Sequence, residues 1–260
     1  MGHRAILAIW LVLASGALGE NLLRAQSPPK NERPAQANKN PDSRLLWLAA
    51  IPLERLNPKT REGVQRVLEQ PTLSAHGPAE VFRARPSFYR WLLDHPDRAV
   101  LMWHRLGAHC LTISDRGNGR FGWADGQGTD ITWQTVHAVP GLQIWYAEGT
   151  ATPGPVLPPV PLRAVVVLRY AESSALSPLV REGEPHGKTL MFHQAELYMQ
   201  TDSQAAALIT KLLGSSAPKL AEQCVGQMEM FFSALAWYVE RHPERAGTLM
   251  SGLLPSVPAN

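Results

Sequence analysis

Residues 130–150 read DITWQTVHAVPGLQIWYAEGT, and this stretch decides the fold class. Two runs rich in β-branched and aromatic residues stand on either side of Pro140-Gly141, a dipeptide that marks a turn. Each run has the length of a strand, so the stretch predicts two successive strands, residues 130–139 and 142–150, joined by a tight turn. We therefore expect an antiparallel meander around it.

More strands are expected on both sides of this hairpin. Upstream, HCLTISDRGNGRFGWAD (109–125) reads as another hairpin, because its Asn-Gly pair offers the positive φ angles of a tight turn. Downstream, LRAVVVLRYAES (162–173) is rich in Val, and GKTLMFHQAELYMQT (187–201) alternates only approximately. With AEVFRA (79–84) as a short early strand, the sequence predicts a sheet of six or seven strands.

Helices are expected before and after these strands. An Asn-Pro pair predicts the start of a helix over residues 58–69. Pro at the first helical position predicts two short helices, residues 86–94 and 96–106. A last apolar stripe begins near residue 203, breaks at 214–218 and continues as one helix that is long for a globular domain.

The order of these elements resembles that of the START-like, or helix-grip, superfamily, which includes polyketide cyclases and lipid-transfer proteins. The resemblance covers residues 75–242 and rests on the helix pair RPSFYRWLLDHPDRAVLMWHRLG (85–107), which leads directly into the strands, and on the last helix. It is a match of topology and includes no diagnostic motif. The helix at 58–69 and the break at 214–218 depart from the superfamily's pattern.

What the resemblance implies is an α+β fold in which a curved antiparallel six- or seven-stranded sheet grips the long C-terminal helix, preceded by a short helix pair. Proteins of this superfamily leave an apolar cavity between sheet and helix, where they hold lipids, sterols or other hydrophobic molecules. The expected function of this chain follows from that cavity.

The chain begins with a targeting signal. His3 and Arg4 precede an apolar run, residues 5–13, and small residues follow as far as Gly19, which is the order of a secretory signal peptide. We expect a cleaved signal within residues 1–25, with an uncleaved N-terminal membrane anchor as the alternative. The protein is therefore expected to be exported to the periplasm, the cell envelope or the extracellular space.

The remainder of the chain divides into four parts. Residues 26–44 contain almost no large apolar side chains and are rich in Pro, which predicts a disordered linker. We expect an N-terminal helical extension over residues 45–74 and the START-like domain over residues 75–245. Residues 246–260 are expected to form a C-terminal tail.

Composition excludes several classes of protein. Of 260 residues, 45% are hydrophobic and 18% charged, which excludes a largely disordered chain and a multi-span membrane protein. The net charge is +3 and the basic residues do not cluster, so no nucleic-acid partner is expected. Charges or Pro interrupt every later apolar run, so beyond the N-terminus we expect at most a transient contact with a membrane.

Three motif-like strings are interpreted as coincidence. GNGRFG (117–122) fits the dinucleotide fingerprint, but a hairpin follows it where a helix is needed. GEPHGKT (183–189) has one residue too few between its glycines for a phosphate loop. His109 and Cys110 are neighbours on an expected strand, so they point to opposite faces and cannot bind one metal ion together. We therefore expect no metal and no cofactor.

The two cysteines, Cys110 and Cys224, have two interpretations. In an exported chain they could form one disulfide. Two buried thiols in an apolar core agree at least equally well with so small a number of cysteines.

Tryptophan is the most frequent aromatic residue, with 8 Trp against 6 Phe and 5 Tyr. Trp123, Trp133 and Trp145 lie on three successive expected strands, so they could line one face of the sheet and contact a bulky apolar ligand. The alternative is that they only fill the core. The ligand contacts expected between the sheet and the last helix are Trp123, Trp133, Trp145, Tyr170, Phe192 and Met228.

The function favoured by the sequence is that of an exported, noncatalytic carrier for a lipid or other hydrophobic small molecule. The first alternative is a cyclase-like or hydrolase-like enzyme on the same fold, which requires at least two polar groups to converge. The second is a structural or interaction protein of the envelope with a filled core, which binds partners through PGPVLPPVP (153–161). The candidate polar groups of an enzyme are His137, Glu148, Tyr170, His193 and Glu196.

Overall fold

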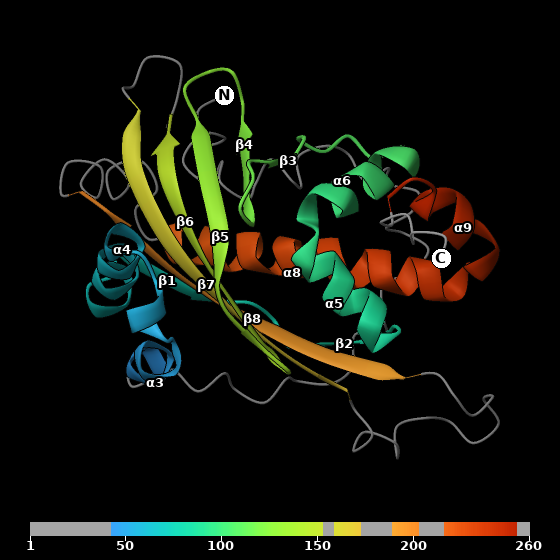
Figure 1. Ribbon diagram of the computed structural model, residues 1–260, viewed down its shortest axis with the longest axis horizontal. Coiled ribbons are helices and arrows are strands. Elements are labelled where there is room, and N and C mark those ends of the chain that lie inside the picture. Colours follow the sequence, from blue (N-terminus) through green and yellow to red (C-terminus); the bar gives the residue numbers. More distant parts are fainter. Residues whose placement is uncertain (1–42, 153–158, 173–188, 203–215, 254–260) are drawn as a thin grey trace, which may run out of the picture.

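The structure of the protein, a computed structural model, describes residues 43–152, 159–172, 189–202 and 216–253. They form an α+β fold in which a curved antiparallel sheet of eight strands lies across one long helix, as the sequence predicts (Figure 1). The strands are β1 (Leu73–His76), β2 (Glu80–Arg83), β3 (Ser114–Asp115), β4 (Arg120–Ala124), β5 (Asp130–Val139), β6 (Leu142–Ala151), β7 (Val160–Glu172) and β8 (Leu190–Thr201). From β3 to β8, each strand pairs with the next one along the chain, which gives the order β1-β8-β7-β6-β5-β4-β3.

The edge of the sheet beside β8 is a strand broken into two halves. β1 and β2 both pair with β8 in antiparallel register, with Leu73 opposite Met199 and Arg83 opposite Leu190. Residues 77–79, Gly-Pro-Ala, separate the halves, because Pro cannot donate a hydrogen bond to the neighbouring strand. Eight strands therefore occupy seven positions, which explains the difference from the six or seven strands expected.

Helices cover one face of the sheet, called the inner face below. The helix pair predicted from Pro86 and Pro96 is present as α5 (Pro86–Asp94) and α6 (Pro96–Arg105). The long helix is α8 (Ala217–Arg241), and α9 (Pro243–Met250) follows it after one residue. Figure 1 shows α8 passing behind the strands, with α5, α6 and α9 gathered towards its C-terminal end.

The opposite, outer face carries α3 (Ser43–Ala50), a short 3-10 helix (Leu53–Arg55) and α4 (Pro58–Glu69). The predicted start of α4 is confirmed, because Asn57 Oδ1 accepts a hydrogen bond from the backbone N–H of Thr60 at 2.9 Å. α4 lies close to the sheet at Gly63, where the hydroxyl of Tyr146 occupies the space that a Cβ would take. The first helices thus form a second layer on the sheet.

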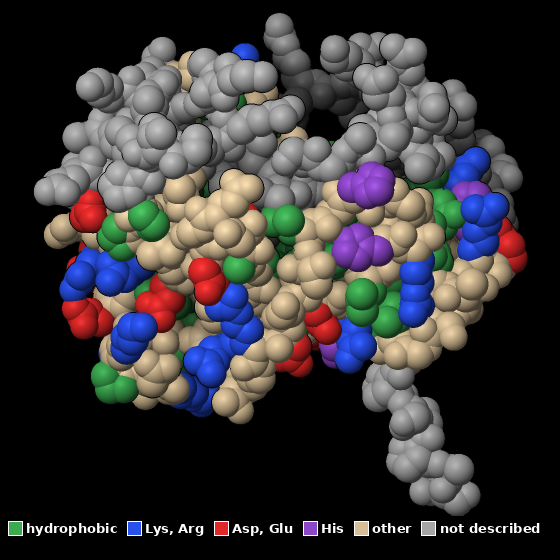
Figure 2. All heavy atoms as spheres, turned by 90° about the horizontal axis from the view of Figure 1, so that it is seen from above, with side chains coloured by type: hydrophobic (Ala, Val, Ile, Leu, Met, Phe, Trp, Pro, Cys, Tyr) green, Lys and Arg blue, Asp and Glu red, His purple; other side chains and the backbone are tan. Residues whose placement is uncertain are grey.

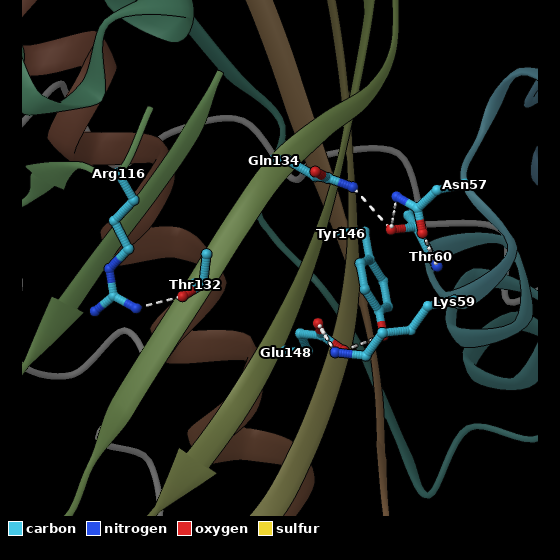
Figure 3. A network of polar contacts seen from close by, with 8 residues as sticks. All are labelled: Asn57, Lys59, Thr60, Arg116, Thr132, Gln134, Tyr146 and Glu148. Carbon is cyan, nitrogen blue, oxygen red and sulfur yellow. Dashed lines mark hydrogen bonds and ion pairs between the residues drawn. The ribbon is translucent and has the colours of Figure 1, made fainter. Parts of the chain in front are cut away.

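Polar contacts fix α4 to this face. Lys59 forms an ion pair with Glu148 at 2.7 Å, and Gln134 donates to the hydroxyl of Thr60 at 3.0 Å (Figure 3). The hydroxyl of Tyr146 also donates to Glu148, at 3.3 Å. This network joins α4 to β5 and β6 on the outer face of the sheet.

Strand alternation divides the buried side chains between two cores. Along β8, Met191 and Ala195 lie in the large core between the inner face and α8. Tyr198 lies in the smaller core under α4, together with Val165 and Val167 of β7. Odd and even positions of β8 therefore have opposite surroundings, as the two-residue repeat of a strand requires.

The strand expected over residues 109–115 is wrong in length, because only Ser114–Asp115 pairs with β4. The physical reason is that His104 Nε2 donates to the carbonyl oxygen of Cys110 at 2.9 Å, which ties this backbone to α6. The Asn-Gly pair of the tight turn that follows has the expected positive φ angles, 55° at Asn118 and 68° at Gly119.

α9 crosses the domain boundary expected at residue 245. Ala246 and Leu249 are buried in the inner core, so at least this part of residues 246–260 packs with the domain. The expected signal (1–25), nearly all of the linker (26–44) and the helix near residue 203 lie outside the described residues.

Candidate functional site

The three tryptophans singled out in the sequence lie on the inner face. Trp123 on β4, Trp133 on β5 and Trp145 on β6 are each at most 6% exposed and belong to the core that contains α8. Trp145 stacks on Phe232 of α8, with ring centroids 6.3 Å apart and an angle of 11° between the planes. The strands therefore bring these side chains onto one surface that faces the long helix.

The other three expected ligand contacts divide between the two faces. Met228 on α8 is buried in the same core, and Tyr170 on β7 packs against it. Phe192 lies on β8 between Met191 and His193, which both face inwards, so its side chain points to the outer face. The structure thus brings five of the six residues together and separates Phe192 from them.

A chain of polar side chains crosses the inner core near the broken edge strand. The Tyr89 hydroxyl lies 2.6 Å from His193 Nδ1, and His193 Nε2 lies 3.0 Å from Glu80 Oε2. Ser233 Oγ donates to the same Glu80 oxygen at 2.9 Å. Because a carboxylate only accepts, Nε2 donates to Glu80 and Nδ1 accepts from Tyr89.

Tyr89 and His193 are both fully buried, whereas the side chain of Glu80 is 31% exposed. Burial, together with the charges of Glu229 and Glu80, raises the pKa of Tyr89 well above its ordinary value. The hydroxyl therefore stays protonated at neutral pH and acts as a hydrogen-bond donor. The polar chain runs from a partly exposed acid at the sheet edge into the core.

Glu229 of α8 lies beside this chain and is 1% exposed. Its Oε1 accepts the backbone N–H of Ala195. Its Oε2 has no hydrogen-bond partner among the described residues. Burial raises the pKa of Glu229 to about 9, the Ala195 N–H opposes this shift, and the charge of Glu80 adds to it. The carboxyl is thus protonated at neutral pH.

The position of Glu229 follows from the break in the edge strand. Gly77 N–H donates to the Ala195 carbonyl at 2.8 Å, but the Ala195 N–H, which a continuous strand would satisfy, turns to Glu229. Glu229 Oε2 also fills the space where a Cβ of Gly77 would stand. The Glu229 carboxyl therefore lies at the break between β1 and β2, where it contacts Gly77 and bonds to Ala195.

The polar residues considered for an enzyme lie on different faces. Tyr170 and His193 are cross-strand neighbours on the inner face. Glu148 pairs with Lys59 of α4, and Glu196 binds Trp47 of α3, so both lie on the outer face. His137 is opposite Ile144, which belongs to the outer core, so it lies there too. Only two of the five candidates share the inner face.

Sequence reasoning missed four members of the polar cluster, namely Glu80, Tyr89, Glu229 and Ser233. One signal for Glu229 was present. Val225, Glu229 and Phe232 are spaced so that they share one face of α8, and a carboxyl within an apolar helical stripe indicates a buried acid. Glu80 carries no such signal, because its partners come from distant segments.

Cys110 and Cys224 are free thiols in the structure. Cys224 is buried and Cys110 is partly buried, and burial raises the pKa of the Cys110 thiol and that of Cys224, the latter to about 12. Both are therefore weak nucleophiles at neutral pH, because the thiolate is the reactive form. The geometry agrees with the second interpretation, that of two separate thiols.

The described surface is mixed in charge. Figure 2 shows Lys and Arg side chains lying among Asp and Glu side chains on the face in view, with apolar groups scattered between them. Within the part of the chain that the structure describes, no helix has the length and apolar character required to cross a bilayer.

Comparisons with known proteins assign no family to the chain. No family model matches the chain, and none of the curated proteins matches it significantly. Among solved structures, a conserved protein from Geobacillus kaustophilus is similar with a TM-score of 0.37 and 12% identity, over 63% of this chain and 95% of that one. An uncharacterised protein from Rhizobium leguminosarum is similar with a TM-score of 0.29 and 13% identity, over 62% of this chain and 97% of that one.

Proposed function

We propose that this chain is an exported, noncatalytic carrier of the START-like type, which holds a lipid or other hydrophobic small molecule between the inner face of the sheet and α8. The observation that carries the proposal is the aromatic surface of Trp123, Trp133 and Trp145, which faces α8 and meets Phe232. The element order and the sheet order support the assignment to this superfamily. Large flat rings beside flexible Met228 suit a ligand with a bulky apolar body.

The first experiment is native mass spectrometry of the mature protein from its host, followed by organic extraction of whatever copurifies. A defined adduct that extracts as a lipid would support the carrier function and identify the ligand. A bare protein mass, with no rise in melting temperature across a lipid panel, would contradict it. An envelope interaction role would then be the better explanation.

Substitutions locate the site of such a ligand. Trp145→Phe removes the stacked partner of Phe232 and is expected to weaken retention of the adduct. Trp237→Phe is the matched control, because Trp237 is only partly buried and contacts Arg241 at 5.5 Å. Equal loss of the adduct in both variants would place the ligand elsewhere.

A second candidate function, a cyclase-like or hydrolase-like enzyme, is favoured by one observation, the chain Tyr89–His193–Glu80. A histidine held between a hydroxyl and a carboxylate is the arrangement of a general base. However, the hydroxyl is fully buried and its pKa is raised, which opposes its use as a nucleophile. Turnover of p-nitrophenyl butyrate by the wild type, abolished in His193→Gln, would establish this function.

A further inference from the structure

The polar cluster of Glu80, Tyr89, His193, Glu229 and Ser233 is drawn from four separate elements, β2, α5, β8 and α8. Four of the five side chains have a hydrogen-bond partner within the cluster. Glu229 is the exception, because its Oε2 is buried without a partner among the described residues. A buried polar atom that lacks a partner costs free energy, so a group that completes it would bind favourably.

Charge indicates what that group would be. The charges that perturb the pKa of Glu229 and that of Tyr89 all belong to acidic groups, namely Glu80, Glu229 and Tyr170. Glu80 and Glu229 therefore lie near each other, and the basic side chain in contact with Glu80 is His193. Two neighbouring carboxyl groups, one of them fully buried, attract a positive charge more than a negative one, because the dielectric around the buried group is low.

The acidic end lies next to the aromatic surface. Phe232, which stacks on Trp145, lies about one helical turn from Glu229 on α8. Met228 directly precedes Glu229 in the chain. At the other side, Glu229 Oε2 lies against Gly77, whose neighbours Pro78 and Ala79 are exposed. The Glu229 carboxyl thus lies between the aromatic surface and the break between β1 and β2.

We propose that Glu229 and Glu80 bind the ammonium group of an apolar amine, so that the carried ligand is a cationic amphiphile. This inference rests on the proposed carrier function and specifies its ligand class. The ammonium would donate to Glu229 Oε2 and to Glu80, and the hydrocarbon body would lie along the tryptophans. Charge-assisted hydrogen bonds of this kind are stronger than neutral ones.

Binding would also move a proton. The ammonium enters with its own protons, Glu229 loses its carboxyl proton to the solvent, and an ion pair replaces the neutral acid. The other titratable groups that face Glu229 are Glu80 from β2, His193 from β8 and Tyr89 from α5. Close to one proton is therefore expected to be released for each amine bound near neutral pH.

The test uses dodecylamine, dodecanol and dodecanoate with the full chain, by calorimetry in buffers of different ionisation enthalpy. Dodecylamine is expected to bind about tenfold more tightly than the other two, with release of a proton. Glu229→Gln and Glu80→Gln should each remove this preference and leave dodecanol binding unchanged. Glu222→Gln, an exposed acid on the same helix, is the matched control.

The outcomes separate the two proposals. Equal binding of the three probes, or an amine preference that persists in Glu229→Gln, would overturn the cationic ligand and leave the carrier function standing. Failure of all three probes to bind, in a protein whose circular dichroism is that of a folded chain, would overturn the carrier function for alkyl ligands and this inference with it.

Discussion

At the scale of single residues, Glu229 makes two contacts that the break in the edge strand requires. Its carboxyl group accepts a hydrogen bond from the Ala195 N–H, which has no partner on the broken edge strand. It also occupies the position that a Cβ of residue 77 would take. It does so at a cost, because the carboxyl is buried and its second oxygen has no partner among the described residues. Both features can be tested by substitution.

Glu229→Gln is expected to stabilise the protein at pH 8 and to change little at pH 4. The pKa of Glu229 is about 9 in the folded state, against 4.5 for an ordinary glutamate. Between these values the unfolded chain releases a proton that the folded chain keeps, so stability falls as pH rises, by at most about 1.4 kcal/mol per pH unit. Gln keeps the acceptor for Ala195 and does not titrate.

Urea unfolding at several pH values measures this difference. The free energy of unfolding of the wild type should fall more steeply with pH than that of Glu229→Gln. Glu222→Gln, whose side chain is exposed, should follow the wild type. Parallel pH curves for the wild type and Glu229→Gln would contradict a protonated Glu229.

Gly77→Ala is expected to destabilise the protein by about 1 to 3 kcal/mol. A Cβ at this position would stand 2.1 Å from Glu229 Oε2, and the hydrogen bond from Ala195 prevents the carboxyl from moving away freely. Thermal unfolding measures the effect, with Gly247→Ala as control, because nothing lies within 4 Å of a Cβ there. The penalty should shrink in a Glu229→Ala background, and an unchanged penalty would mean that the clash is not with Glu229.

At the scale of elements, the helix ends were the easiest features to predict. The predicted boundary between α5 and α6 lies at His95-Pro96, because Pro disfavours helix in the residue before it, and the same pair of residues, His242-Pro243, separates α8 from α9. Local chemistry decides such ends, so local sequence predicts them. The strand 109–115 was wrong because a long side chain, His104, reaches across to the backbone of Cys110.

Trp47 is the residue of α3 that forms polar contacts with the sheet. Trp47 Nε1 donates to Glu196 Oε2 at 2.9 Å, and Arg169 lies over the Trp47 ring at 5.6 Å while it pairs with Glu196 at 3.0 Å. Two residues of this short helix, Leu45 and Leu46, are exposed, and Leu48 packs beside Trp47 against the outer core. An isolated helix of this length is unstable in water.

Trp47→Phe is therefore expected to release α3 without unfolding the domain. The ring contact with Arg169 survives the substitution, but the hydrogen bond to buried Glu196 is lost. Amide hydrogen exchange in residues 43–50 should become about tenfold faster, with residues 58–69 unchanged as the internal reference. Unchanged exchange in residues 43–50, or equally faster exchange in α4, would contradict this role. Trp237→Phe is the control for the loss of an indole.

At the scale of the whole molecule, the sequence predicted the order of elements and the face of the tryptophans, but not the polar cluster. Strands and helices follow from spacing along the chain, as in residues 130–150. The cluster joins Glu80 to Ser233 and Tyr89 to His193, pairs that are 153 and 104 residues apart. The pairing of β2 with β8 and the positions of α5 and α8 bring these residues together. A local sequence pattern does not predict contacts between segments so far apart in the chain.

The C-terminal boundary of the domain is set by α9. Residues beyond 245 were expected to be a tail, yet α9 buries Ala246 and Leu249 in the inner core. Arg105 of α6 also donates to the backbone carbonyl of Ser251 at 2.9 Å. α9 therefore closes the end of the core beside α6 and should unfold together with the sheet.

Leu249→Ala tests this directly and is expected to destabilise the protein by about 2 to 5 kcal/mol, because it removes buried methyl groups from a packed core. Urea unfolding should be followed both by tryptophan fluorescence and by far-ultraviolet circular dichroism, since the tryptophans report the core and α9 adds to the helix signal. The two transitions should coincide in the variant and in the wild type, as for one cooperative unit. Leu101→Ala, at an exposed position of α6, is the matched control and should have little effect. An unchanged stability in Leu249→Ala, or a separate early loss of helix signal, would show that residues 246–260 form an independent tail, as expected from the sequence.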